Sequence, residues 1–530
     1  MNWRELGVVR SRLQVAPRHA FAVVLVLAFL SLACWSFADP LVAAPDEQAH
    51  ILRADALVHG QFGSPTTPPS KVSVMVTLPT SMVYSAVYPI CWQQKQDVPA
   101  TCSAPWPTNE APVPVSIYVA HYPPLYYLLV GSATYVSQQR GVIYLMRLIS
   151  CALSALMLAL SAYAIARWSR RRTLYAALLV VLTPQVTFLA SSVNPSGFEI
   201  TTAVCLWTLV TIWGFEHRED PPRALITLLA VVAGVLVLIR GLSPLWLALA
   251  TVTLIVLVGP RASYDLVRRR HDIQRAGVAV AGAGVLAALW IFTQGTLNIL
   301  PVGYAVPRGS STFATVRLVA SFIQGWLREC VGILGWLDTE LPGFVYRSWY
   351  TIVIGLLVIA LWRGNWRDRL LVAGLAVLVP LLPFLLVLRQ AKVLGVVWQG
   401  RDILPLAVGA AIVAMSVAGA PPVTRARRAA ARVTALTRQR VATSCLVGVI
   451  GVVSLANLLA FYTNLRRYAV GRYGPTFFFL HAQGWSPPTG QFLTLALYGL
   501  VTAGFGGVIV VWVWLSRGDA DASSSRARIG

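Results

Sequence analysis

Two acidic residues follow the first apolar run, in Pro45-Asp46-Glu47-Gln48-Ala49-His50-Ile51-Leu52-Arg53. A proline followed by acids is typical of a helix start, because carboxylates there lie near the positive end of the helix dipole. On such a helix Asp46, His50 and Arg53 share one face, at i, i+4, i+7 spacing. We therefore expect an acid, an imidazole and a guanidinium to act together, with a carboxylate as general base or metal ligand. The alternative is helix capping with a local ion pair.

Four further polar strings lie beside apolar runs. They are His121-Tyr122-Pro123-Pro124-Leu125-Tyr126-Tyr127, Ser192-Val193-Asn194-Pro195, Gly335-Trp336-Leu337-Asp338-Thr339-Glu340-Leu341-Pro342 and Trp398-Gln399-Gly400-Arg401-Asp402. The string at His121 fits a structural turn with an aromatic anchor, or a site. Asn194 fits a helix cap, but Glu199, one turn into the next helix, is harder to explain structurally. Asp338 and Glu340 form a second acid pair, in a polar turn or a site.

The composition is that of a chain surrounded by lipid. Of its 530 residues 57% are hydrophobic and 12% charged, against about 25% charged in soluble domains. The net charge of +23 comes from short basic clusters between apolar runs, at 167–172, 268–275 and 425–440. Such clusters are typical of cytoplasmic membrane anchors, so we exclude nucleic acid as a partner and expect the lipid bilayer instead.

Apolar length and loop charge predict an all-α membrane protein with both termini in the cytoplasm. About twelve spans are expected, at 20–38, 142–166, 173–192, 197–215, 223–241, 243–259, 276–297, 348–362, 369–388, 403–419, 442–462 and 491–515. The run 21–38 is expected to be a retained first helix, not a cleaved signal peptide. The apolar segment 122–136 is not counted, because a span there would put the clusters 167–172 and 425–440 outside. We expect a short helix or re-entrant segment there.

This topology divides the chain into a cytoplasmic tail, a membrane domain and a disordered tail. Their ranges are 1–20, 21–515 and 516–530; the long outer segments are 39–141, 298–347 and 462–491, and a shorter one is 389–402. All the polar strings face one compartment. Cys91 and Cys102 share the first outer loop and are expected to form a disulfide. The other five cysteines lie in or beside apolar runs, as small core residues.

Arginines on this outer side oppose the usual charge bias. They are Arg240, Arg401, Arg466 and Arg467. Because arginine can bind phosphate through two N–H groups at once, an anionic outer ligand would explain them. The alternative is pairing with Asp338, Asp402 or phospholipid.

The strings, in this order over about residues 40–490, resemble a bacterial family of multi-pass membrane proteins of unknown function related to the GT-C glycosyltransferases. The match rests on Pro45-Asp46-Glu47-x-Ala49-His50, His121-x-Pro123-Pro124-Leu125-Tyr126-Tyr127, Ser192-Val193-Asn194-Pro195, Gly335-Trp336-Leu337-Asp338-Thr339 with Leu341-Pro342, and Gln399-Gly400-Arg401. The chain departs from the family at Asp402, where tyrosine is expected, and at Gln48, where proline is common. Asp402 puts an acid beside Arg401 and so bears on whether that arginine is free for phosphate.

The resemblance implies a GT-C layout, in which a large outer loop with an acidic motif and juxtamembrane helices follows the first span. It implies transfer of a sugar from a polyprenyl-phosphate donor to a glycan or lipid acceptor of the cell envelope, with inversion, at the bacterial plasma membrane. Asp46 matches the family's first-loop acid, with Glu47 as its neighbour. A divalent cation, Mg²⁺ or Mn²⁺, is compatible with this chemistry but not required by it.

The remaining residues take supporting roles under this hypothesis. His50 and His121 would orient Asp46 or bind sugar hydroxyls, and Arg240, Arg401 or the pair Arg466-Arg467 would hold the lipid phosphate. Arg53, Asn194, Glu199 and Asp338 complete the expected substrate-binding set.

Other functions remain open. An outer-face polysaccharide polymerase or ligase needs the same acid and arginines, and only donor size separates it. A lipid-linked-glycan transporter or flippase predicts ionisable residues near mid-bilayer, whereas polar residues here gather at one end of the spans. A structural scaffold would not need five polar strings on one side.

Overall fold

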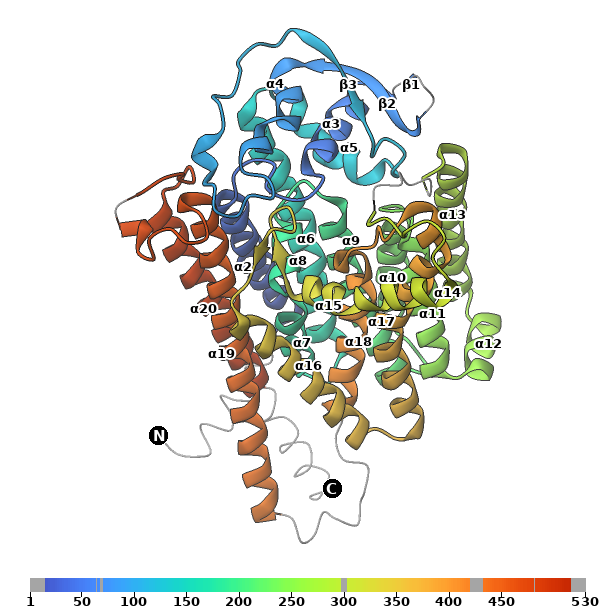
Figure 1. The fold of residues 1–530 in the computed structure, drawn as a ribbon. Coiled ribbons are helices and arrows are strands. Elements are labelled where there is room, and N and C mark those ends of the chain that lie inside the picture. Colours follow the sequence, from blue (N-terminus) through green and yellow to red (C-terminus); the bar gives the residue numbers. More distant parts are fainter. Residues whose placement is uncertain are drawn as a thin grey trace.

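The computed structural model describes residues 15–62, 64–66, 70–296, 303–419, 432–480 and 482–515. It is a bundle of helices with residues 39–139, here called the cap, at one end (Figure 1). The expected disordered tail 516–530 lies outside the described residues. So do most of the N-terminal tail and part of the basic cluster 425–440.

Nine helices within the described residues are long and apolar enough to cross a bilayer. They are α2 (Pro17–Ala38), α6 (Arg140–Trp168), α9 (Pro195–Glu216), α13 (His271–Gln294), α16 (Gly343–Arg363), α17 (Trp366–Leu394), α18 (Gly400–Ala418), α19 (Arg432–Val470) and α20 (Gln491–Leu515). Each contains or overlaps one of the expected spans. The prediction of a mostly helical, multi-pass membrane protein is confirmed.

The other three expected spans are shorter or broken. The segment 173–192 is divided into α7 (Leu174–Val181) and α8 (Pro184–Ala190), because Pro184 has no N–H to continue the helix and Thr183 caps α8. The helices α10 (Arg223–Val237) and α11 (Ser243–Val258) have 15 and 16 residues. A bend of 100° separates α11 from α12 (Pro260–Arg269), whose residues are not buried. Along the chain, the helices that correspond to the expected spans run alternately toward and away from the cap (Figure 1).

Several helix ends differ from the prediction, and three of them lie beside the polar strings or outer arginines. α19 continues to Val470, about two turns beyond the expected end at 462, so Arg466 and Arg467 lie on a helix and not in a loop. α17 likewise continues to Leu394. α18 begins at Gly400, so Arg401 lies in its first turn. The reason is that hydropathy measures the apolar part of a helix, whereas a polar capping box of Gln399 and Asp402 starts α18 earlier.

The cap combines helices with one small antiparallel sheet. Its elements are α3 (Glu47–Val58), β1 (Ser64–Thr66), β2 (Ser70–Pro79), α4 (Thr80–Val83), β3 (Pro112–Ile117), α5 (Leu125–Gly131) and the 3-10 helices Tyr84–Ala86, Tyr88–Cys91, Ala100–Cys102 and Ser132–Tyr135. The strand order is β1-β2-β3. α5 has seven residues, far fewer than the roughly 20 that span a bilayer, so leaving 122–136 out of the spans is confirmed. Cys91 and Cys102 form the expected disulfide.

Smaller elements lie between the later spans on the cap side. They are α14 (Thr312–Ser321), α15 (Ile323–Val331), the two-stranded ribbon of β4 (Ile333–Leu334) and β5 (Thr339–Glu340), and the 3-10 helix Phe478–Leu480. Trp336, just after β4, donates from its indole N–H to the Val42 carbonyl of the cap at 3.1 Å. Four of the five remaining cysteines are buried or half-buried as expected, but Cys445 is exposed, because it lies on an outward face of α19.

The centre of the bundle is α9, which packs against α18. Trp207 of α9 is fully buried, and its indole N–H donates to the Pro405 carbonyl at 2.9 Å. A Cβ added at Gly409 of α18 would lie 2.1 Å from the Trp207 ring. The hydrogen bond to Pro405 keeps that ring from moving aside, so only glycine fits at this crossing.

Gly409→Ala is therefore expected to destabilise the protein by about 1–3 kcal/mol, the usual cost of overpacking. The matched control is Gly284→Ala on α13, where an added Cβ meets nothing within 4 Å. Unfolding of both variants in mixed detergent micelles measures the difference. Equal stability of the two would mean that the α9–α18 crossing is not tightly packed.

Candidate active site

Asp46 lies where the cap meets the first turn of α18. It is the residue before α3 and has φ 65°, a left-handed conformation that aspartate tolerates better than most residues. Its carboxylate accepts hydrogen bonds from the Tyr118 hydroxyl at 2.8 Å and from the Arg401 guanidinium. The expected helix begins one residue later than predicted, so Asp46 is its N-cap residue; its carbonyl accepts the His50 N–H at 3.1 Å, and its carboxylate charge still acts on the His50 ring.

The Asp46 carboxylate is charged and partly accessible. Its side chain is 28% exposed, whereas that of Arg401 is 11% exposed. Burial raises the pKa of this carboxyl, but the nearby Arg401 charge and the hydrogen bonds from Arg401 and Tyr118 outweigh burial and lower the pKa below its ordinary value. Asp46 is therefore ionised at neutral pH.

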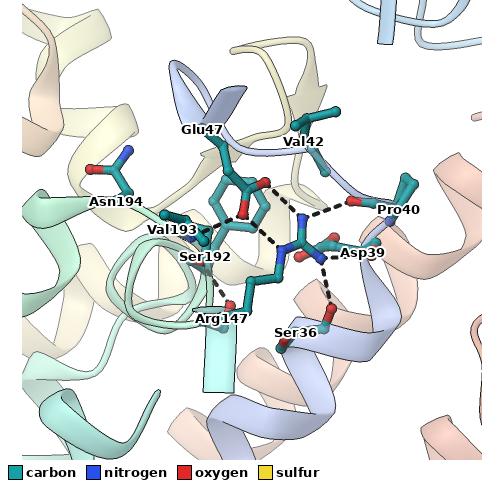
Figure 2. Close-up of polar contacts among 12 residues, drawn as sticks. Ser36, Asp39, Pro40, Val42, Glu47, Arg147, Ser192, Val193 and Asn194 are labelled. Atoms are coloured by element: carbon teal, nitrogen blue, oxygen red, sulfur yellow. Dashed lines mark hydrogen bonds and ion pairs between the residues drawn. The ribbon is translucent and has the colours of Figure 1, made fainter. Parts of the chain in front are cut away.

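Glu47, the adjacent acid, is fully buried and bonded on both oxygens. Arg147 of α6 donates to it from Nε and Nη2, each at 2.7 Å, and the Val193 N–H donates at 2.9 Å (Figure 2). The same guanidinium also donates to the carbonyls of Ser36, Asp39 and Pro40. Glu47 thus ties α3 to α6 and to the segment before α9, and both of its oxygens are already bonded.

Arg147 is not among the site residues predicted from the sequence, although its position in the sequence indicates that it needs a partner. It lies inside the expected span 142–166, where a buried charge requires a partner. Tyr118, just after β3, gave no such signal, because tyrosines are common beside membranes.

Asn194 connects the start of α9 to the same junction. Its side-chain oxygen accepts the Ser196 N–H at 2.9 Å, which is a helix cap, and its amide donates to the Pro45 carbonyl at 3.1 Å. Asn194 therefore holds the backbone next to Asp46.

Arg240 lies in a buried ion-pair network. It donates to Glu199 at 2.9 Å and to Asp402 at 3.1 Å, and the Ser243 hydroxyl donates to Glu199 at 2.6 Å. This is the pairing kept above as the alternative to phosphate binding. Asp402, which stands where the family pattern has tyrosine, bonds to Arg240 and not to Arg401. Arg401 is therefore paired with Asp46.

Asp338, Arg466 and Arg467 form a different contact region. Arg467 donates to Asp338 at 2.9 Å and also to the cap carbonyls of Trp92, Lys95 and Val98. Arg466 bonds to the Gly474 carbonyl. The Arg467 contacts fasten α19 to the cap, and none of these bonds involves Asp46.

His50 and Arg53 lie on α3, and His121, in the segment after β3, lies near Arg53. The His50 ring nitrogen Nδ1 is 2.9 Å from the Tyr127 hydroxyl. Burial, opposed by Asp46 and assisted by the Arg401 and Arg240 charges, lowers the pKa of His50 to about 3, so the ring is neutral. Burial and the Arg53 charge also lower the pKa of His121.

The two first-loop acids do not fit a divalent cation in this arrangement. Glu47 has both oxygens bonded to Arg147, and Asp46 faces the Arg401 guanidinium, which would repel a cation. Among the described residues, no three His, Cys, Asp or Glu side chains come together as a metal-binding group.

Replacing Arg147 tests the buried pair. Arg147→Met leaves the Glu47 charge buried without a partner and is expected to destabilise the protein by about 3–5 kcal/mol. The double variant Glu47→Leu/Arg147→Met removes both charges of the pair and should recover most of that loss. Detergent-induced unfolding measures both, with Arg18→Met, at an exposed position of α2, as control. If the double variant were no more stable than the single one, the ion pair would not be what joins these elements.

His50 gives a pH dependence with a defined sign. Below about pH 6.5 the unfolded chain binds a proton on His50 that the folded state, with a pKa of about 3, does not bind. Its contribution to stability is therefore complete above pH 6.5 and decreases toward pH 3, by up to about 2 kcal/mol between pH 7 and 5.

His50→Gln should consequently lose less stability than the wild type when the pH falls from 7 to 5. His271→Gln, at an exposed position, should behave like the wild type. An identical pH response of His50→Gln and the wild type would show that the folded protein protonates His50.

Among solved structures, the chain is similar to ArnT from Cupriavidus metallidurans. The form bound to undecaprenyl phosphate is 15% identical, with a TM-score of 0.40, over 96% of this chain and 78% of that one. The apo form is 14% identical, with a TM-score of 0.39, over 94% and 76%. No curated protein matches the chain.

A family comparison covers most of the membrane domain. The family described as "Predicted membrane protein (DUF2142)" matches residues 29–410, a range that includes Asp46, Glu199 and Arg401. The expected relation to a family of multi-pass membrane proteins is thereby confirmed, and the chain belongs to the DUF2142 family of predicted membrane proteins.

Proposed function

We propose that this protein is a membrane glycosyltransferase that moves a sugar from a polyprenyl-phosphate donor to a cell-envelope acceptor, with Asp46 as general base. The observation that carries the proposal is the environment of Asp46. It is an ionised, 28% exposed carboxylate at the edge of the bundle, oriented by Tyr118 and Arg401. A carboxylate in this state can accept a proton from a hydroxyl group.

The reaction requires one proton transfer and one displacement. Asp46 accepts the proton of the acceptor hydroxyl as that oxygen attacks the anomeric carbon. The bond from this carbon to the phosphate oxygen breaks, and the polyprenyl phosphate leaves with the electron pair. Direct displacement from the opposite side inverts the anomeric centre. Positive charge near the leaving oxygen lowers the barrier, because negative charge develops there.

Each of the two adjacent acids has its own role. Tyr118 and Arg401 hold the Asp46 carboxylate in one orientation, which reduces the cost of bringing base and hydroxyl together. Glu47 is a positioning residue and not a catalytic one, because its oxygens are bonded to Arg147 and Val193. No step of the proposed reaction passes through a metal ion on these acids.

Charge distribution supports an extracytoplasmic cap and cytoplasmic termini. The arginines of 167–172 lie at or just after the end of α6 away from the cap, and those of α12 lie at the same end (Figure 1). Basic residues concentrate on the cytoplasmic side of membrane proteins. The Cys91–Cys102 disulfide fits the oxidising compartment on the cap side.

Asp46→Asn tests the proposal directly. It keeps the shape of the side chain but removes the base, so transfer is expected to fall about 10²–10⁴-fold. The assay is release of undecaprenyl phosphate from undecaprenyl-phosphate-linked sugars, by protein in nanodiscs with extracted envelope glycans as acceptors. Glu340→Gln, a 44% exposed carboxylate on the cap side, is the matched control and should keep full activity. Equal rates for Asp46→Asn and the wild type would contradict the proposal.

A further inference from the structure

Almost every buried arginine on the cap side has a carboxylate partner. The pairs are Arg147 with Glu47, Arg240 with Glu199 and Asp402, Arg401 with Asp46, and Arg467 with Asp338. Arg53 of α3 is the exception. It is 1% exposed, its Nε and Nη1 atoms have no hydrogen-bond partner, and it forms no ion pair with a carboxylate of the described residues.

An unpaired buried guanidinium is energetically unfavourable. Arginine does not lose its proton under physiological conditions, so Arg53 cannot escape the cost of burial by becoming neutral. That cost is large for a charge without a counter-ion. A protein that keeps such a group in place has a positively charged site that an anion would complete.

The neighbours of Arg53 suit an anionic ligand. His121 is half-buried, and its Nε2 atom also lacks a partner. Since His121 is neutral at physiological pH, its ring can supply an N–H donor without adding charge. Arg53 lies three residues after His50, so it is on the same side of α3 as the histidine nearest Asp46.

We propose that Arg53 and His121 bind the phosphate group of the lipid-linked donor, which places the leaving group along α3 from the Asp46 base. This inference rests on the proposed function. Arg147, Arg240, Arg401 and Arg467 would first have to give up a carboxylate, whereas Arg53 has none to give up. Its planar guanidinium also matches phosphate oxygens through two N–H groups.

Binding, without turnover, tests the proposal. The probes are undecaprenyl phosphate, undecaprenol and inorganic phosphate, each titrated into protein in nanodiscs with tryptophan fluorescence as the signal. Arg53→Gln should weaken binding of undecaprenyl phosphate at least tenfold and leave undecaprenol binding unchanged. Arg53→Lys keeps the charge and should lose less affinity. Arg328→Gln, at an arginine on the cap side whose side chain is 36% exposed, is the matched control and should bind as the wild type does.

The stability of the ligand-free protein tests the proposal independently of binding. Arg53→Gln removes an uncompensated buried charge, so the unliganded variant should be at least as stable as the wild type. A structural arginine bonded within the fold would give the opposite sign. Undecaprenyl phosphate should then raise the unfolding temperature of the wild type more than that of Arg53→Gln.

Two results would overturn the proposal. One is unchanged affinity of Arg53→Gln for undecaprenyl phosphate. The other is equal affinity of the wild type for inorganic phosphate, which would assign a soluble phosphate ester to the site. Asp46→Asn separates this proposal from the previous one. If that variant transfers sugar at the wild-type rate while Arg53→Gln still loses lipid-phosphate binding, the base assignment fails and the phosphate site stands.

Discussion

The buried ion pair of Glu47 and Arg147 is the interaction on which the site depends. Arg147 lies in the first third of α6, and it bonds the cap, the end of α2 and, through Glu47, the segment before α9. Both side chains are removed from water, which costs free energy that only a bidentate pair with further carbonyl acceptors offsets. Because all those acceptors are in place, the pair fixes the position of α3 relative to the bundle.

The position of Asp46 follows from that constraint. With Glu47 drawn inward to Arg147, the preceding residue has to turn outward, and φ 65° at Asp46 is how the backbone does so. A left-handed conformation costs an L-residue about 1–2 kcal/mol, and such conformations persist where the surroundings hold them. Asn194 bonded to the Pro45 carbonyl and Arg401 bonded to Asp46 provide that hold. The two neighbouring carboxylates thus have different environments: that of Glu47 is neutralised in the core, and that of Asp46 is accessible.

The sequence predicts features that depend on the properties of single residues or short segments. It does not predict features that depend on which residues come into contact in the folded protein. Apolar length located the spans, and loop charge excluded 122–136, since both signals are local. The start of α18 and the end of α19 were misplaced because a polar first turn and a polar last turn are invisible to hydropathy. The sequence identifies the acid at 46 but not the left-handed turn there, because that turn depends on Arg147, 101 positions later. Which arginine pairs with which carboxylate is likewise set by the packing of α9, α10 and α18.

The pairing of charges determines how the site can respond to a ligand. Carboxylates neutralise Arg147, Arg240, Arg401 and Arg467, so these groups stay in place whether or not a ligand is present. An anion arriving near Arg401 would compete with Asp46 and disturb the orientation of the base. An anion arriving at Arg53 meets no such competitor, and it balances a charge that the fold leaves uncompensated. The electrostatic design therefore favours a rigid base and a separate anion site, in which binding stabilises the protein without rearranging the residues that hold Asp46.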